Sequence, residues 1–122
     1  MILILILFSC IDIGKHECEK YSIEILYDEH TFLLIGEHSL KMLRFTDKHG
    51  FTLKEVEFNS DVKLYNYKSD FEKIKSEENI DTLYFEISSS EINTSIRRDF
   101  TGYIYEKKNQ PKSKTVCPNR IL

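Results

Sequence analysis

Apolar and polar residues alternate with a period of two through most of the chain between Tyr21 and Tyr105. A period of two places successive side chains on opposite faces of a strand, so it predicts strands with one buried face. Turn-forming residues interrupt the alternation at short intervals, for example at Asp47–Gly50, and predict tight hairpins. The predicted strands span 21–27, 31–35, 40–45, 51–58, 62–67, 82–87 and 96–105.

One short helix is predicted near residues 70–78. Ser69 and Glu72 have the spacing of a capping box, in which each side chain bonds to a backbone amide of the first turn. Asn79 is a suitable residue to end the helix. The sequence therefore predicts an α+β fold, mainly antiparallel β with about seven short strands, in which the helix packs on one face of a curved sheet.

Three further local features are expected. The apolar parity of the fourth strand shifts near Glu55, which indicates a β-bulge. Gly102 is a place where the last strand could bend. Residues 107–122 contain Pro111 and Pro118 and are interpreted as an irregular tail.

The length and charge of the chain limit its organisation and its partners. A chain of 122 residues has room for one domain, which we assign to residues 21–106. All 20 acidic residues precede residue 107, so the domain is acidic, and nucleic acid is not an expected partner. The tail, residues 107–122, carries five basic residues and no acidic one. It could contact anionic lipid headgroups or fold back onto the acidic domain.

The N-terminus begins with an uninterrupted apolar run, Ile2–Phe8. Seven residues are too few to span a bilayer but match the apolar region of a signal peptide. The following residues, Leu7-Phe8-Ser9-Cys10, resemble the lipobox of bacterial lipoproteins: an aliphatic residue, a small residue, then cysteine. The resemblance implies cleavage before Cys10, lipidation of its thiol and anchoring to a membrane of the bacterial cell envelope. Residues 1–9 would be the signal and residues 10–20 a tether.

An alternative interpretation of the N-terminus is a β-strand. The run of alternating Ile and Leu is also typical of a strand that is buried on both faces, in which case the protein would be a soluble β protein. Signals of the lipoprotein class usually begin with Lys or Arg, and no such residue precedes Cys10. A truncated signal, with a start codon further upstream, is one interpretation of this difference.

The chain contains three cysteines: Cys10, Cys18 and Cys117. An odd number in an exported protein leaves one thiol unpaired. Lipidation of Cys10 would remove that thiol and leave Cys18 and Cys117 as a pair. Such a pair persists as a disulfide in an oxidising compartment, so we expect a bond that closes almost the whole domain. Two unpaired thiols are the alternative.

Tyrosines are the best candidates for a binding surface, because they give large, fairly rigid contact area with a polar tip. Tyr65 and Tyr67 share one strand face, and Tyr103 and Tyr105 share another. If both pairs lie on one exposed face, they form a recognition patch, to which Tyr84 could also belong. The alternative is that they pack beneath the helix or cover the polar side of the sheet.

The four histidines fall in or beside predicted turns. Glu29-His30 and Glu37-His38 are similar pairs, and a hairpin could bring them together to bind a metal or share a proton. The alternative is that the histidines are solvated turn residues. Ser88–Ser90 offers hydroxyls without a nucleophile motif around them, and we expect neither a metal nor a cofactor.

These observations favour a non-enzymatic binding or interaction protein that is anchored to a membrane and acts on a protein partner that the sequence does not identify. The alternative is a small lipid-anchored enzyme or ligand carrier that uses the turns rich in His and Glu.

Overall fold

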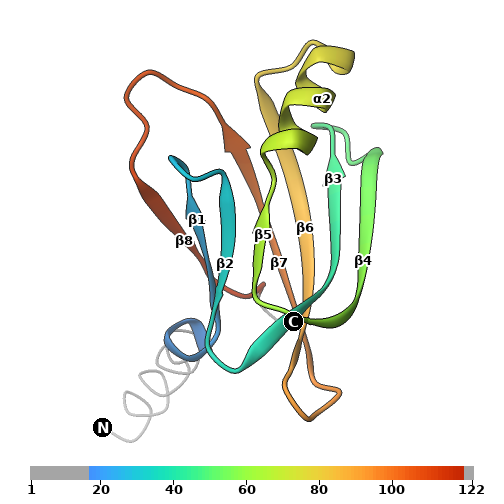
Figure 1. Cartoon of the computed structure of the whole chain (residues 1–122), viewed down its shortest axis with the longest axis vertical. Helices are drawn as coiled ribbons and strands as arrows, with labels where there is room; N and C mark the ends of the chain where they lie inside the picture. Colours follow the sequence, from blue (N-terminus) through green and yellow to red (C-terminus); the bar gives the residue numbers. More distant parts are fainter. Residues whose placement is uncertain (1–16, 120–122) are drawn as a thin grey trace, which may run out of the picture.

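The computed structural model describes residues 17–119, which form eight strands in two four-stranded sheets (Figure 1). Sheet A has the strand order β5-β2-β1-β8, and sheet B has the order β4-β3-β6-β7. All of the strand pairs are antiparallel. The elements are β1 (Ser22–Leu26), β2 (Thr31–Ile35), β3 (His38–Thr46), β4 (Thr52–Val62), β5 (Leu64–Asn66), α2 (Lys68–Glu78), β6 (Thr82–Glu91), β7 (Arg97–Tyr105) and β8 (Ser113–Val116). The predicted α+β, mainly antiparallel fold is confirmed.

The core lies between the two sheets. Alternate residues of both sheets point inward, as the period of two predicts, and form one cluster of buried side chains. Phe32 of sheet A joins the layers, because its ring contacts those of Phe45 and Phe85 in sheet B. Only Lys63 separates β4 from β5, and its carbonyl accepts a hydrogen bond from the amide of Leu34. The chain therefore passes directly from one sheet to the other along this edge.

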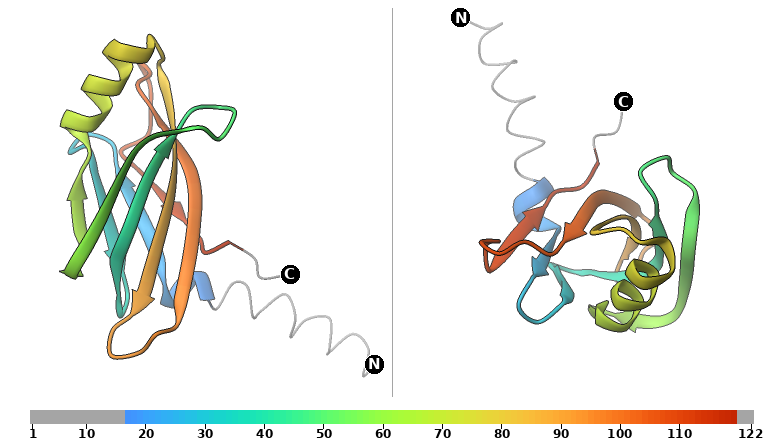
Figure 2. Two further views of the ribbon diagram at one scale, coloured as in Figure 1. Left: turned by 90° about the vertical axis from the view of Figure 1, so that its right-hand side faces the viewer. Right: turned by 90° about the horizontal axis from the view of Figure 1, so that it is seen from above.

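Helix α2 lies across one end of the sandwich rather than on a sheet face (Figures 1 and 2). Its buried residues Phe71 and Ile74 close the core at that end. The helix begins after Tyr67, whose side chain makes no capping hydrogen bond, so the predicted capping box of Ser69 and Glu72 is wrong. Asn66, which lies outside the helix, accepts a hydrogen bond from the Lys68 amide instead. Asn79 ends the helix in the left-handed conformation, as predicted.

The strand irregularities lie close to the predicted position but not at it. Glu55 pairs regularly with Arg44, so no bulge is centred there. The register between β3 and β4 shifts instead at Leu53 and again between Glu57 and Val62. Gly102 packs against a ring: a Cβ added there would lie 2.8 Å from the Phe85 ring. The absence of a side chain allows this close approach.

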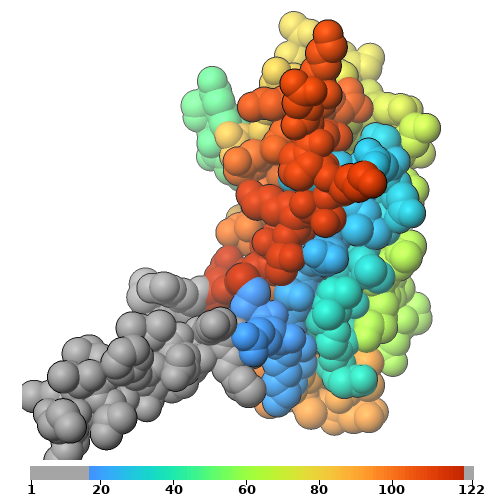
Figure 3. Space-filling model, turned by 90° about the vertical axis from the view of Figure 1, so that its left-hand side faces the viewer, coloured from blue at the N-terminus to red at the C-terminus, as the bar shows by residue number. Residues whose placement is uncertain are grey.

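Part of the expected irregular tail is a strand. β8 pairs with β1, from Ile23↔Val116 to Leu26↔Ser113. The sequence does not indicate this strand, because a short polar segment such as Ser-Lys-Thr-Val lacks clear alternation, and its pairing with β1 is a tertiary contact. The tail therefore folds back onto the domain, which was one of its two predicted arrangements. Figure 3 shows it running along the side of the molecule beside β1.

The two ends of the sandwich differ. Helix α2, the β3–β4 turn and the β7–β8 connection lie at one end, which we call the distal end (Figures 1 and 2). A helical turn at residues 17–20 and the β6–β7 turn lie at the other end, the proximal end. Within residues 17–119, no helix has the length and apolar character needed to cross a membrane.

Candidate functional site

A disulfide between Cys18 and Cys117 joins the helical turn at the proximal end to the segment after β8. The two Cα atoms lie 4.9 Å apart and are separated by 99 residues in sequence. The predicted pairing is therefore confirmed. Cys10 lies outside the described residues, as do residues 1–9, expected to be a signal, and most of the expected tether, residues 10–20. The bond fixes the start of the described chain to sheet A, so that a pull on the upstream segment would act on a crosslinked point.

Tyr65 and Tyr67 do not belong to an exposed patch. Tyr67 is buried and its ring packs on Phe32 and Phe71. Tyr65 is half-buried, and its hydroxyl donates a hydrogen bond to Asp70 on α2. Burial, with the Asp70 carboxylate as a second cause, raises the pKa of Tyr65. These two tyrosines hold the helix on the sandwich, which was the alternative interpretation of the pattern.

Tyr103 lies at the surface beside Tyr84 of the neighbouring strand, whereas Tyr105 is half-buried and its ring centroid lies 5.6 Å from that of the buried Tyr27. The Tyr103 ring centroid is 6.0 Å from that of Tyr84 and 5.7 Å from that of Tyr105. Tyr84 and Tyr103 are 37% and 41% exposed, and they form a directly opposed pair between β6 and β7. Cross-strand aromatic pairs stabilise a sheet, but their exposure also leaves contact area free. We call Tyr84, Tyr103 and Tyr105 the tyrosine strip.

Lysines of the C-terminal segment cover one side of the tyrosine strip. The Lys114 ammonium lies 4.9 Å from the ring centroid of Tyr103, and that of Lys107 lies 5.1 Å from the ring centroid of Tyr105. Both separations are within the range of a cation–π interaction. The local sequence pattern does not indicate this contact, because it depends on the pairing of β8 with β1.

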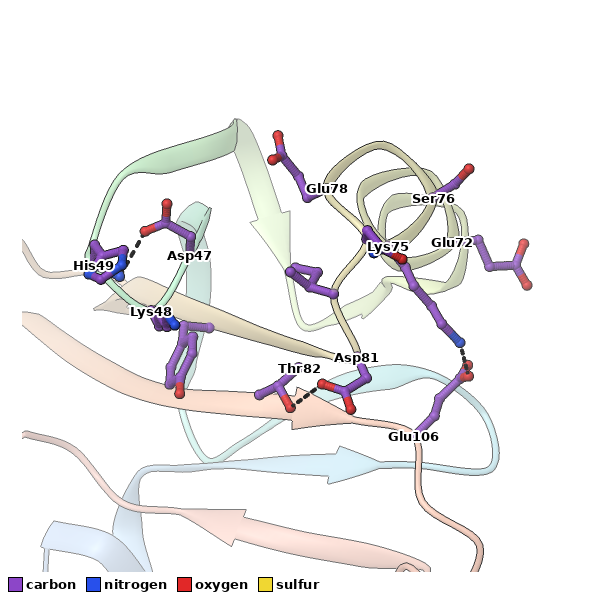
Figure 4. Close-up of a pocket in the computed structure, with 13 residues that line it drawn as sticks. Asp47, Lys48, His49, Glu72, Lys75, Ser76, Glu78, Asp81, Thr82 and Glu106 are labelled. Carbon is purple, nitrogen blue, oxygen red and sulfur yellow. Dashed lines mark hydrogen bonds and ion pairs between the residues drawn. The ribbon is translucent and has the colours of Figure 1, made fainter.

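A hollow of about 1000 Å³ lies on the other side of the tyrosine strip, at the distal end. Figure 4 shows the β3–β4 turn, with Asp47, Lys48 and His49, on one side of it and α2 on the other. Asp81 and Thr82 lie between them, and Tyr84 also lines the hollow. The hollow is therefore built from residues 47–49, from the continuous stretch 72–84 and from Glu106.

The hollow is acidic. Five carboxylates line it, against two lysines, of which Lys75 is bound to Glu106 at 2.8 Å. The hydrogen bond to Glu106 raises the pKa of Lys75. Asp47 is used within its own turn, where its side chain accepts hydrogen bonds from the amides of His49 and Phe51. The remaining carboxylates are those of Glu72, Glu78 and Asp81.

Phe51 projects from the distal end next to the hollow. At 70% exposure it is the most exposed large apolar side chain among residues 17–119. It follows the turn that carries Asp47 and His49, and Gly50 gives this turn its positive φ of 86°. An exposed aromatic ring on a hydrogen-bonded turn is typical of a contact surface, because burial of the ring on binding is favourable.

The proximal end carries a charged cluster around Arg98. The guanidinium of Arg98 lies 2.9 Å from a Glu17 carboxylate oxygen and 3.3 Å from one of Glu91. The Tyr21 hydroxyl donates a hydrogen bond to Glu91, and this bond lowers the pKa of Glu91. The cluster is largely enclosed and uses its charges internally, which indicates a structural role: it attaches the helical turn to sheet B.

His38 is a buried residue and not a solvated turn residue. Its Nδ1 lies 2.8 Å from the Ser89 hydroxyl, and its Nε2 lies 2.9 Å from the carbonyl oxygen of Ile35 and 3.1 Å from that of Ser22. With two acceptors on one side, Nε2 must carry the proton, so Nδ1 accepts from Ser89. Burial lowers the pKa of His38. The ring thus serves as a hydrogen-bonding connector between β1, the end of β2 and β6.

The pairs Glu29-His30 and Glu37-His38 do not converge. They flank the two ends of β2, so the strand separates them. Ser88 and Ser89 are buried in β6, where they bond to Asp99 and His38, and do not form a loop. In the described part of the chain, no three His, Cys, Asp or Glu side chains are grouped closely enough to hold a metal ion. His16 lies outside the described residues.

Comparisons with protein-family models, with curated proteins and with solved structures gave no match for this chain.

Proposed function

We propose that this protein is a lipid-anchored binding module of the bacterial cell envelope, without enzymatic activity, that contacts a protein partner through its distal end. The observation that carries this proposal is the group of exposed aromatic side chains at that end: Phe51, Tyr84 and Tyr103. Tyr84 lines the hollow, Tyr103 is its partner across the strands, and Phe51 follows the turn that borders the hollow, which is open enough to receive part of a partner.

The anchor half of the proposal rests on the motif Leu7-Phe8-Ser9-Cys10. Two features support it. The Cys18–Cys117 disulfide suits an oxidising compartment outside the cytoplasm. The described chain also begins at the proximal end, so an anchor upstream of residue 17 would leave the exposed aromatic rings at the end away from the attachment point.

The intact mass of the protein from bacterial membranes tests the anchor. The expressed gene should include any upstream start codon. We expect loss of residues 1–9 and the added mass of acyl chains on Cys10, and a gain of two hydrogens on reduction of the disulfide. A full-length, unmodified chain in the soluble fraction would contradict the anchor and favour the interpretation of Ile2–Phe8 as a strand.

Site-specific photo-crosslinking in intact cells tests the binding surface. A photoreactive phenylalanine analogue is placed at position 51, in the full chain. The matched control places it at Ile96, which is 53% exposed in the β6–β7 turn at the proximal end. We expect a defined protein adduct from position 51 that is absent from position 96. Equal labelling from both positions, or from neither, would contradict a distal binding surface.

A further inference from the structure

Charge changes sign across the tyrosine strip. On the Tyr84 side lie the hollow and its carboxylates, between the β3–β4 turn and α2. On the Tyr103 and Tyr105 side lie Lys114 and Lys107. The order across the strands is thus acidic residues, tyrosines and lysines. The carboxylates of Glu78 and Asp81 belong to the segment that leads into β6, whereas the lysines follow β7 or lie on β8, the edge strand of sheet A that contacts β7. Glu106, between Tyr105 and Lys107, is bound to Lys75.

The charges on both sides have no ion-pair partner among residues 17–119, although Lys107 and Lys114 contact the rings of Tyr105 and Tyr103. Within residues 17–119, no ion pair involves the exposed lysines of the C-terminal segment: Lys107, Lys108, Lys112 and Lys114. The same holds for the three carboxylates Glu72, Glu78 and Asp81. A surface that carries unpaired charges of both signs, on either side of an aromatic strip, is complementary to itself when it is rotated by 180° about the strip.

The direction of the rotation axis has a consequence for the anchor. An axis that runs along the strip, parallel to the strands, places the carboxylates of one copy opposite the lysines of the other at two equivalent places. The same axis keeps the long axes of the two copies parallel, so both proximal ends point the same way. Two chains anchored in one membrane satisfy this condition.

We infer that the tyrosine strip is a homodimer interface, in which a second copy of this chain is the partner. The Lys107 and Lys114 side of each copy contacts the Glu78 and Asp81 side of the other, and the tyrosines meet at the two-fold axis. This inference rests on the proposed function, because it names the partner of part of the same distal surface.

Charge reversal on each side separately gives a specific test. One variant carries Glu78→Lys with Asp81→Lys and is basic on both sides of the strip. The other carries Lys107→Glu with Lys114→Glu and is acidic on both sides. The control is Glu57→Lys, an exposed residue on β4, the opposite edge strand of sheet B. Full-length chains with two different affinity tags are co-expressed and co-purified from detergent-solubilised membranes.

We expect the unmodified chain and the Glu57→Lys variant to co-purify with themselves. Each double variant should co-purify with itself about tenfold less, which corresponds to about 1.4 kcal/mol of lost interaction. Co-expression of the two different double variants should restore the complex, because the basic variant then faces the acidic one. An increase of salt to about 1 M should weaken the complex through screening.

Failure of the two variants to associate with each other would overturn the inference, as would an unmodified chain that is monomeric. Gain of two hydrogens on reduction shows that each variant retains its disulfide, and far-UV circular dichroism shows that it retains its fold. A monomeric chain that still crosslinks a different protein from position 51 would overturn the dimer and leave the proposed function standing.

Discussion

The guanidinium carbon of Arg98 lies 3.7 Å from the centre of the Tyr21 ring, although 77 residues separate the two in sequence. The contact joins β7, an edge strand of sheet B, to the residue that directly precedes β1 of sheet A. Arg98 is only 14% exposed and also contacts Glu17 and Glu91, so removal of its charge would leave two carboxylates close together.

Arg98→Ala should therefore lower the free energy of unfolding by about 1–3 kcal/mol, between the values for exposed and buried ion pairs. Urea denaturation of the purified full chain, followed by tyrosine fluorescence because the chain has no tryptophan, measures this change. Arg97→Ala is the matched control. Arg97 is 62% exposed and pairs with an exposed Asp99, so its loss should change stability by less than about 1 kcal/mol. Equal effects of the two substitutions would contradict the structural role of the cluster.

Loss of the Cys18–Cys117 disulfide should destabilise the domain strongly. The bond closes a loop of about 100 residues, and constraint of the unfolded chain by such a loop contributes about 4–5 kcal/mol in the chain-entropy description. Cys117→Ser should show most of this loss in urea denaturation. Cys18→Ser with Cys117→Ser should be no less stable than Cys117→Ser alone, because the first substitution already removes the bond. A Cys117→Ser variant as stable as the parent protein would be inconsistent with a disulfide that tethers the fold.

Substitution of two glycines with positive φ distinguishes the cost of backbone strain from the cost of a steric clash. Gly50 (φ 86°) has no atom within 4 Å of an added Cβ, whereas a Cβ on Gly36 (φ 103°) would lie 2.1 Å from the Lys20 carbonyl oxygen. Gly50→Ala should cost about 1–2 kcal/mol through its conformation alone. Gly36→Ala should cost about 1–3 kcal/mol more, because backbone must move to relieve the clash. The comparison is made by urea denaturation, and a larger loss in Gly50→Ala would contradict the packing of the β2–β3 turn on residue 20.

The free energy of unfolding should decrease as the pH is lowered, because His38 titrates differently in the folded and unfolded states. Burial lowers the pKa of His38 in the folded protein below the ordinary value of 6.5. Just below pH 6.5, His38 therefore binds a proton in the unfolded chain but stays neutral in the folded protein. The contribution of neutral His38 to stability is complete above pH 6.5. As the pH falls below 6.5, the free energy of unfolding decreases by at most about 1.4 kcal/mol per pH unit.

Urea denaturation at several values between pH 5 and pH 7.5 measures this slope. His38→Gln should remove it, at the cost of lower stability at pH 7.5 from the lost hydrogen bonds. His49→Gln, in the exposed β3–β4 turn, is the matched control and should retain the slope. Retention of the full slope in His38→Gln would assign the titration to another group.

The sequence by itself determined the type and order of most elements of this protein. Alternation of apolar side chains and the turn residues between them are local, so the strands from β1 to β7 and the hairpin at Asp47–Gly50 could be predicted. The helix could be predicted near residues 70–78, although the capping box that supported its start is wrong, and its end could be predicted from Asn79, which tolerates the left-handed conformation. The Cys18–Cys117 pair followed from counting thiols, with Cys10 assigned to a lipid.

Only the tertiary structure decided which side chains meet. β8 is a strand because β1 offers it a free edge, and no property of Ser113–Val116 alone requires this. The alternating pattern shows that each tyrosine pair, Tyr65 with Tyr67 and Tyr103 with Tyr105, shares one face of its strand. It does not show which of these faces other elements of the fold cover. Helix α2 covers the first two and leaves Tyr103 exposed. The burial of His38 and the approach of Arg98 to Tyr21 likewise depend on pairing between distant strands, whose register the local pattern does not contain.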